Sequence, residues 1–153
     1  MVDHSVEGKE LGTVRVPVES SKFAELARAL HDDDLVWHDP SAAAAVGFDH
    51  VPAQPTATVV VDHWRPDGAL GHAAALGLDL TRVLHGEAAW EFLEPIRLGD
   101  ELTATTTVAG VSSREGKRGG EMTLITLETT FVNQRGNLAL RRQDTLIETG
   151  PRA

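Results

Sequence analysis

The sequence contains no cysteine. This absence excludes disulfide bridges, thiolate metal sites and a cysteine nucleophile. Packing and backbone hydrogen bonds must therefore stabilise the fold. The absence is compatible with a reducing compartment.

Long apolar runs are also missing. Nowhere do about 18 apolar residues follow one another, which is the length that a membrane-spanning helix needs. The first residues, Met1 to Ser5, include neither the basic stretch nor the apolar stretch of a secretion signal. We therefore expect a cytoplasmic protein that has no membrane partner.

Basic residues are scarce, with 14 Lys and Arg against 23 Asp and Glu and a net charge of −9 at pH 7. A chain this acidic repels nucleic acid unless its basic residues are sharply clustered. The one basic cluster lies at residues 114–120, which we interpret as a solvated hairpin tip; contact with a phosphate of coenzyme A or of a carrier protein arm is the alternative. We therefore expect no nucleic-acid partner.

The first half of the chain combines one strand with helical segments. Its 153 residues suit a single domain, and no repeat or linker divides residues 1–153. Alternation over residues 12–18 predicts a strand, which Pro17 places at an edge or an end. Ser20 or Ser21 is expected to cap a helix that reaches Leu30, because its apolar residues recur at helical spacing.

The second half of the chain is rich in strands. Residues 88–96, 101–111, 121–133 and 137–148 are predicted to form them, with hairpin connections. The apolar segment 56–64 precedes these strands; its β-branched residues favour a strand and Pro55 favours a buried helix, so both remain open. The order predicts an α+β fold in which an antiparallel sheet covers this segment with one face.

Several short motifs occur in an order and spacing that resemble a known family. They are Phe23 to Asp34, Asp39, Gly47-Phe48, Pro52-Ala53-Gln54-Pro55-Thr56, Leu84-His85-Gly86-Glu87 and Pro95-Ile96-Arg97-Leu98-Gly99-Asp100. Together they resemble the MaoC-like dehydratase N-terminal family, or FAS1-type dehydratase region, over roughly residues 8–148.

The resemblance implies a hot-dog fold, in which an antiparallel sheet wraps around a central helix and two such domains pair into a continuous sheet. It also implies an acyl group carried on coenzyme A or acyl carrier protein as ligand, and no metal or redox cofactor. Active relatives hydrate 2-enoyl thioesters to (R)-3-hydroxyacyl thioesters or run the reverse dehydration. We expect a homodimer, or a heterodimer with a catalytic hot-dog subunit.

Active relatives move protons with an Asp and a His five residues later, in a Gly-Asp-x-Asn-Pro-x-His stretch. A gapless alignment keeps the Asp as Asp32 but places Trp37 where the His belongs, and an indole cannot accept or deliver that proton. Family members with an aromatic residue here act as the acyl-binding partner of a catalytic subunit. A shift of one residue would instead pair Asp33 with His38 as a catalytic pair.

Two further residues are candidates for substrate binding. Gln54 precedes Pro55 at the expected start of the central helix, where a free backbone N–H favours a developing oxyanion. His85 opens a strand that could face the thioester groove, or it hydrogen-bonds its own loop. No metal site is expected, because the spacing of the histidines suggests none.

Three functions follow from these residues. The first is an acyl-binding subunit with little or no activity of its own, for which Trp37 is the distinguishing residue. The second is a self-sufficient homodimeric hydratase that uses Asp33 and His38, or Asp32 with a histidine from elsewhere. The third is a hot-dog thioesterase that uses Asp62 on the central segment.

Overall fold

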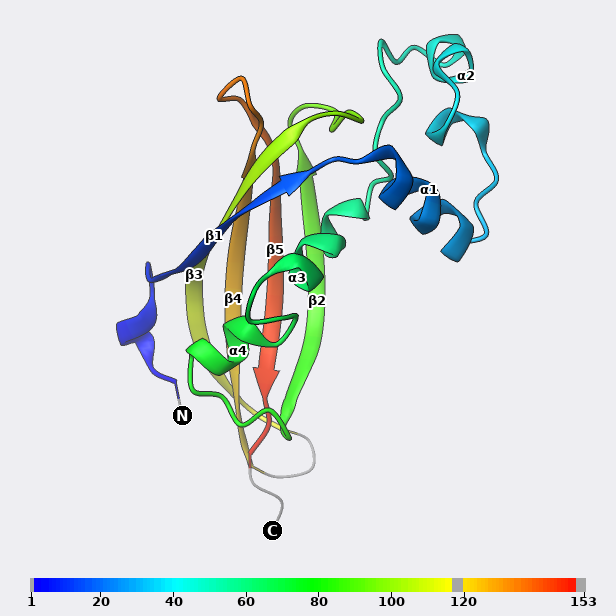
Figure 1. Cartoon of the computed structure of the whole chain (residues 1–153). Coiled ribbons are helices and arrows are strands. Elements are labelled where there is room, and N and C mark those ends of the chain that lie inside the picture. Colours follow the sequence, from blue (N-terminus) through cyan, green and yellow to red (C-terminus); the bar gives the residue numbers. More distant parts are fainter. Residues whose placement is uncertain (1, 117–119, 151–153) are drawn as a thin grey trace.

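The computed structural model of the protein describes residues 2–116 and 120–150 (Figure 1). Five strands form one antiparallel sheet in the order β1-β3-β4-β5-β2. The strands are β1 (Glu10–Pro17), β2 (Val83–Phe92), β3 (Glu101–Glu115), β4 (Glu121–Val132) and β5 (Leu138–Glu148).

Helical segments lie in two places. The helices, with η marking 3-10 helices, are η1 (His4–Val6), α1 (Ser20–Ala29), η2 (Leu35–Trp37), α2 (Pro40–Ala45), η3 (Ala57–Val60), α3 (Val61–Trp64) and α4 (Gly71–Ala75). In Figure 1, α1 and α2 lie beyond one end of the sheet, whereas α3 and α4 lie across its face. The segment around α2 has a small core of its own, made by Val36, Ala43 and Val51.

The central apolar segment is helical, which resolves the alternative left open by its composition. It runs as η3 directly into α3, and Ala57 and Val61 pack into the main core with Phe131 and Leu140 of the sheet. Pro55 precedes the first turn, a position where its fixed backbone angle favours a helix. The predicted α+β arrangement, with a sheet around one central helical segment, is confirmed.

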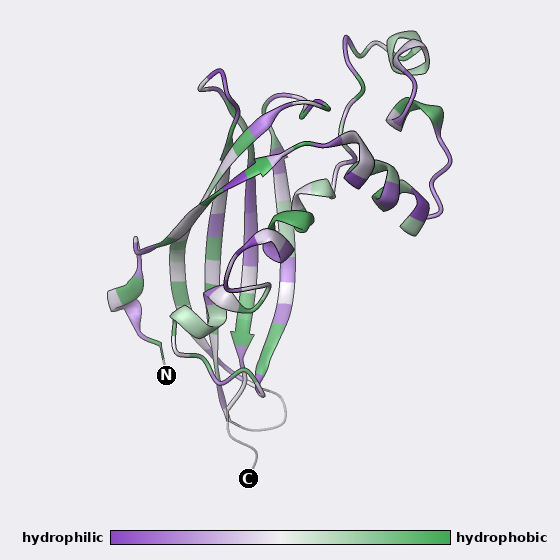
Figure 2. Ribbon diagram, viewed as in Figure 1, coloured by the Kyte–Doolittle hydropathy of each residue, from purple (hydrophilic) through white to green (hydrophobic). Residues whose placement is uncertain are grey.

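The alternation of side chains in β3 and β4 explains why the sheet covers this segment with one face. Along β4, Thr123, Ile125, Leu127, Thr129 and Phe131 are buried, and the residues between them are partly exposed. Figure 2 shows bands of hydrophobic and hydrophilic residues along the strands. Buried threonines are satisfied across the ladder, as when the hydroxyls of Thr106 and Thr129 lie 2.9 Å apart.

The predicted strand 88–96 is wrong at both ends, because β2 spans Val83–Phe92. At its start, a bulge between His85 and Glu87 accommodates Gly86, whose missing Cβ would approach Ile147 Cδ1 to 2.9 Å. At its end, the backbone N–H groups of Leu93 and Glu94 both turn to the carbonyl of Ala139, at 2.9 and 3.1 Å. The ladder therefore ends before Ile96.

Smaller differences concern the helix cap and the hairpin tip. The N-cap of α1 is Glu19, which makes no side-chain cap bond, because backbone bonds from Val18 to Asp100 and from Gly99 to Val18 turn the chain one residue before Ser20. β3 is longer than predicted and pairs Glu115 with Glu121. Residues 117–119 of the predicted basic tip lie outside the described residues. Among the described helices, none is long and apolar enough to cross a membrane.

A buried arginine connects the sheet to the central helix. Arg142 of β5 is 3% exposed. Its guanidinium donates to both carboxylate oxygens of Asp62 on α3, at 2.9 and 3.1 Å, to Asp144 at 2.7 Å, and to the carbonyl of Thr58 at 3.2 Å. Two carboxylates and a helix carbonyl thus compensate the burial of one positive charge.

We expect the change Arg142→Ala to lower the free energy of unfolding by about 3–5 kcal/mol, because it leaves two carboxylates without their cation in a poorly solvated place. Urea denaturation followed by circular dichroism measures this loss. The neighbouring Arg141→Ala is the control: Arg141 pairs at 2.9 Å with Glu91, both largely exposed, so its loss should cost less than about 1 kcal/mol. Equal losses in the two variants would contradict this account.

Candidate functional site

The loop after α1 brings together two residues that lie five positions apart. The backbone turns sharply at His31, whose φ is 54°, and η2 then presents the Trp37 indole to the carboxylate of Asp32. The indole Nε1–H donates to Asp32 Oδ2 at 2.7 Å, and the backbone N–H of Asp34 donates to Asp32 Oδ1 at 3.2 Å. Both carboxylate oxygens of Asp32 are therefore engaged within the loop.

The alternative pair, Asp33 and His38, is placed differently. Both residues are exposed, and the structure gives no hydrogen bond or ion pair between them within the part of the chain that it describes. Neither residue lines the cavity described next. The gapless alignment, without a one-residue shift, already brings Asp32 into contact with the residue five positions later, Trp37.

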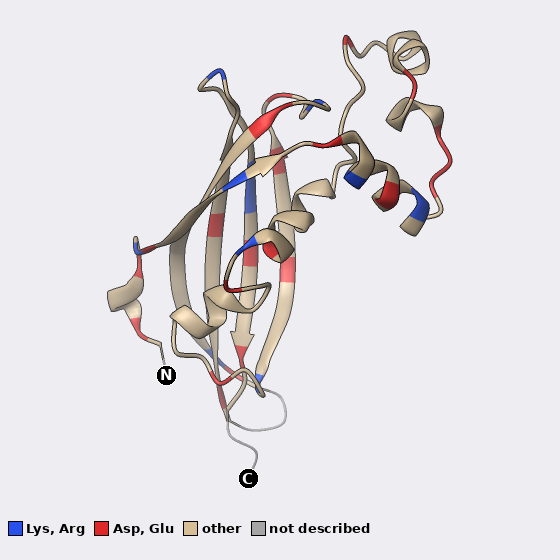
Figure 3. Cartoon of the chain, in the orientation of Figure 1, with Lys and Arg blue, Asp and Glu red and all other residues tan. Residues whose placement is uncertain are grey.

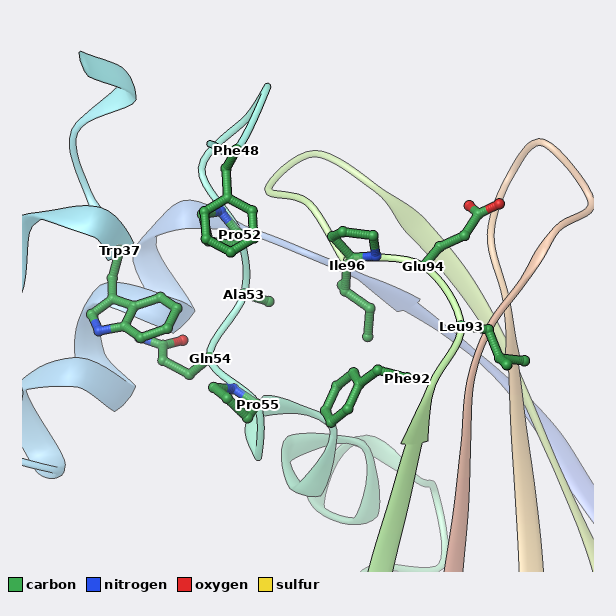
Figure 4. Close-up of a pocket in the computed structure, with 11 residues that line it drawn as sticks. Trp37, Phe48, Pro52, Ala53, Gln54, Pro55, Phe92, Leu93, Glu94 and Ile96 are labelled. Atoms are coloured by element: carbon green, nitrogen blue, oxygen red, sulfur yellow. The ribbon is translucent and has the colours of Figure 1, made fainter. Parts of the chain in front are cut away.

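An apolar cavity of about 290 Å³ opens beside Trp37 (Figure 4). Three segments form its wall, namely the loops around η2 and α2, the residues before the central helix, and the chain that follows β2. The lining residues are Trp37, Phe48, Pro52, Ala53, Gln54, Pro55, Phe92, Leu93, Glu94, Pro95 and Ile96. Trp37 and Gln54, both predicted as binding residues, thus lie on one cavity.

Backbone bonds fix the wall that carries Gln54. Ala53 N–H donates to the carbonyl of Ile96 at 2.8 Å, and Leu98 N–H donates to the carbonyl of Val51 at 3.0 Å. The Gln54 side chain is buried and donates from Nε2 to the carbonyl of Phe23 at 3.0 Å, whereas its Oε1 has no hydrogen-bond partner among the described residues. Since a carbonyl only accepts, this bond fixes which way the amide is turned.

The remaining predicted residues lie away from this cavity. His85 on β2 is exposed, and its Nε2 lies 3.3 Å from Asp144 Oδ1, so it joins the network of Arg142 and does not line the cavity. Asp62 belongs to the same network, as an acceptor of the Arg142 guanidinium. His72 on α4 is buried, and burial lowers its pKa.

The family model described as "FAS1-like, dehydratase domain region" matches residues 5–142. The chain belongs to this family. Among curated relatives, a UPF0336 protein of Streptomyces avermitilis is 36% identical over 99 residues, which is 65% of the length of either chain.

Two solved structures share the fold along nearly the whole chain. A chain of the HadBC (3R-hydroxyacyl-ACP dehydratase) complex of Mycobacterium tuberculosis aligns with a TM-score of 0.72 at 20% identity, covering 93% of this chain and 96% of that one. The MaoC-like dehydratase of Rhodospirillum rubrum aligns with a TM-score of 0.69 at 20% identity, covering 96% and 94%. These likenesses confirm the hot-dog fold expected from the sequence.

The contact between Asp32 and Trp37 can be compared with the dehydratase motif. The gapless alignment with the dehydratase motif predicts that these two positions correspond to the Asp and His of active relatives, and the structure places them in direct contact. The indole here donates a hydrogen bond but has no nitrogen lone pair with which to accept a proton.

The sequence did not reveal the apolar wall of the cavity. Phe48, Phe92 and Leu93 contribute to it, but only Phe48 belongs to a motif, as part of Gly47-Phe48. Phe92 and Leu93 carried a weaker signal: two consecutive large apolar residues interrupt the alternation of a strand and remain 49% and 47% exposed. Trp64 and Trp90 are partly buried and pack against the main core.

Over residues 2–116 and 120–150, no three His, Cys, Asp or Glu side chains lie close enough together to hold a metal ion. The groups available to a ligand in the cavity are therefore apolar side chains, the amide of Gln54 and the carboxylate of Glu94. That carboxylate is already engaged by the side-chain amides of Asn133 and Asn137, at 3.2 and 2.9 Å.

We expect the change Trp37→Phe to lower the free energy of unfolding by about 1.5 kcal/mol, at the low end for a hydrogen bond to a charged group because both partners are only partly buried. A double-mutant cycle with Asp32→Ala isolates this bond. The matched cycle with Asp33→Ala should show coupling near zero, since Asp33 is exposed beside it. Equal coupling energies in the two cycles would show that the hydrogen bond between Trp37 and Asp32 does not stabilise the fold.

Proposed function

We propose that this chain, acting as a single hot-dog domain over residues 1–153, binds an acyl thioester and leaves the proton transfers to another subunit. The assembly would be an (R)-specific enoyl-thioester hydratase, or in the reverse direction a 3-hydroxyacyl-thioester dehydratase. The observation that carries this proposal is the hydrogen bond of the Trp37 indole to Asp32 at the cavity wall.

The chemistry explains why this contact matters. Hydration of an enoyl thioester needs a base to activate water and an acid at the α-carbon. The carboxylate of Asp32 already accepts hydrogen bonds from the Trp37 indole and from the backbone N–H of Asp34. The indole nitrogen has no free lone pair with which to accept a proton. The loop therefore holds the Asp of the motif against a side chain that cannot move the proton.

The cavity suits an acyl chain. Its lining is mostly apolar and its volume of about 290 Å³ lies at the lower limit for small-molecule pockets, so it would hold part of a fatty or polyketide chain. The start of the central helix adds a polar end, where the backbone N–H of Gln54 and the helix dipole could hold the thioester carbonyl. Coenzyme A and acyl carrier protein both remain candidate carriers.

The likeness to a chain of the HadBC complex supports an assembly of this chain with a second subunit. The HadBC complex is described as a 3R-hydroxyacyl-ACP dehydratase built as a complex, and this chain shares its fold. A heterodimer with a catalytic hot-dog subunit would supply an intact Asp and His pair, and a homodimer that keeps Trp37 in both copies would not. The thioesterase alternative has little support, because both oxygens of Asp62 are held by Arg142 and are not free to act as a base.

The purified chain should bind a medium- or long-chain 2-enoyl thioester but hydrate it at least about 10²-fold more slowly than an active relative, since loss of one proton-transfer group costs this much or more. Calorimetry measures the binding, and loss of the conjugated absorbance measures turnover. Phe48→Ala should weaken binding by enlarging the cavity, whereas His38→Ala should change neither quantity.

Turnover that His38→Ala abolishes would establish the Asp33 and His38 pair and overturn the proposal. Failure to bind any acyl thioester would overturn it as well. Addition of a hot-dog subunit with an intact Asp-x-Asn-Pro-x-His stretch, encoded beside this chain, should restore turnover in the mixture.

A further inference from the structure

The strand β2 is the edge of the sheet that is open to pairing. It stands last in the strand order, and the only strand that it pairs with in the described structure is β5. The opposite edge, β1, ends in Pro17, which lacks an N–H, and its ladder with β3 is interrupted by a bulge between Glu10 and Gly12. Beyond its bulge at Gly86, β2 is regular from Glu87 to Phe92.

This edge is continuous with the acyl cavity. Phe92 ends β2, and with Leu93 it both lines the cavity and remains about half exposed. Leu84, near the other end of the strand, is 56% exposed. A strand added to β2 would therefore cover apolar side chains at both ends and lie beside the open side of the cavity.

Two carboxylates on β2 face the outer side of the sheet. Trp90 points inward, because its Nε1–H donates to Thr58 on the central helix, so Glu91 points outward, where it pairs with Arg141. Glu87 lies on the same face as Glu91, opposite Thr145. Figure 3 shows these acidic bands on β2. Glu87 forms no ion pair among the described residues.

The spacing of these carboxylates opposes self-pairing. In a symmetric dimer, β2 would pair with its own copy antiparallel, about a centre within the strand. A centre at residue 87, 89 or 91 places Glu side chains of the two copies directly opposite each other. A centre at 88 or 90 places them on diagonals of about 7–8 Å. Each copy also carries a net charge of −9. Arg141 offsets part of the charge of Glu91, so the repulsion comes mainly from Glu87 and from the net charge.

We propose that β2 pairs with the edge strand of a second hot-dog chain that carries Lys or Arg opposite Glu87 and Glu91, in preference to a copy of itself. This inference rests on the proposed function, in which a different subunit completes the site, and it adds how that subunit is selected. Charge opposite charge would favour the mixed pair, and like charge disfavours the homodimer.

A charge-reversed copy of the chain can stand in for that partner. We expect wild type mixed with the Glu87→Lys/Glu91→Lys variant to form mixed dimers above the statistical proportion, with the equilibrium constant for exchange of the two homodimers into mixed dimers raised about tenfold or more. Isotope-labelled variant, unlabelled wild type and native mass spectrometry at low salt give this proportion directly. The excess should fall as salt is raised, because the pairs are exposed.

The control is Glu10→Lys/Glu101→Lys, which makes the same charge change at exposed positions on the β1 side of the sheet. It should show no comparable excess of mixed dimers. An equal excess would assign the effect to net charge and overturn the inference, as would a mixture without dimers or one at the statistical proportion. The Glu87→Gln/Glu91→Gln variant should self-associate more tightly than wild type, and no gain would also count against the inference.

The dimer experiment can contradict the charge-based selection without contradicting the proposed function. Wild type that binds an enoyl thioester without turning it over, yet shows no preference for the charge-reversed copy, would leave the acyl-binding role intact and remove the charge-based selection of the partner. Preference for the charge-reversed copy without acyl binding would support the charge-based selection of the partner and remove the acyl-binding role.

Discussion

The inner face of the five-stranded sheet packs against the η3–α3 segment and, farther along, against α4. The position of the η3–α3 segment determines where the cavity lies. Ala57 and Val61 fill the space beneath the sheet, and Arg142 ties this segment to β5 through Asp62 and the carbonyl of Thr58. Because these contacts hold the segment in place, the residues just before it, including Gln54, have a fixed position at the end of the sheet.

The cavity lies where this fixed segment meets the end of β2 and the loops around η2 and α2. The proposed function depends on one of the departures from the dehydratase motif, Trp37 in place of the His; Asp34 and Leu35 also replace its Asn and Pro. An indole in place of an imidazole keeps a hydrogen bond to Asp32 and adds apolar surface, but it removes the capacity to shuttle a proton. This is why we propose a site that binds an acyl thioester without reacting with it, and a partner subunit at the edge strand β2.

Much of this could be predicted from the sequence, because it depends on local patterns. Strand-like segments separated by Gly-containing hairpin connections predicted β3, β4 and β5, and the ordered motifs predicted the fold. The spacing of Asp32 and Trp37 indicated a pair that the structure brings into contact. Patterns that depend on tertiary contacts were less visible: the start of β2 depends on a bulge at Gly86 against Ile147, and the cavity wall at Phe92 depends on where the chain leaves the ladder.

The central claim is that Trp37 stands at the acyl site in the place of a proton-transfer residue. The indole N–H signals of the three tryptophans, observed by ¹⁵N-edited NMR during titration with a medium-chain 2-enoyl thioester, test it most directly. The account predicts that the Trp37 signal, assigned with Trp37→Phe, shifts saturably while those of Trp64 and Trp90 move little, and that the thioester is recovered unchanged. A titration in which Trp37 is unperturbed, or in which the hydrated product accumulates, would contradict it.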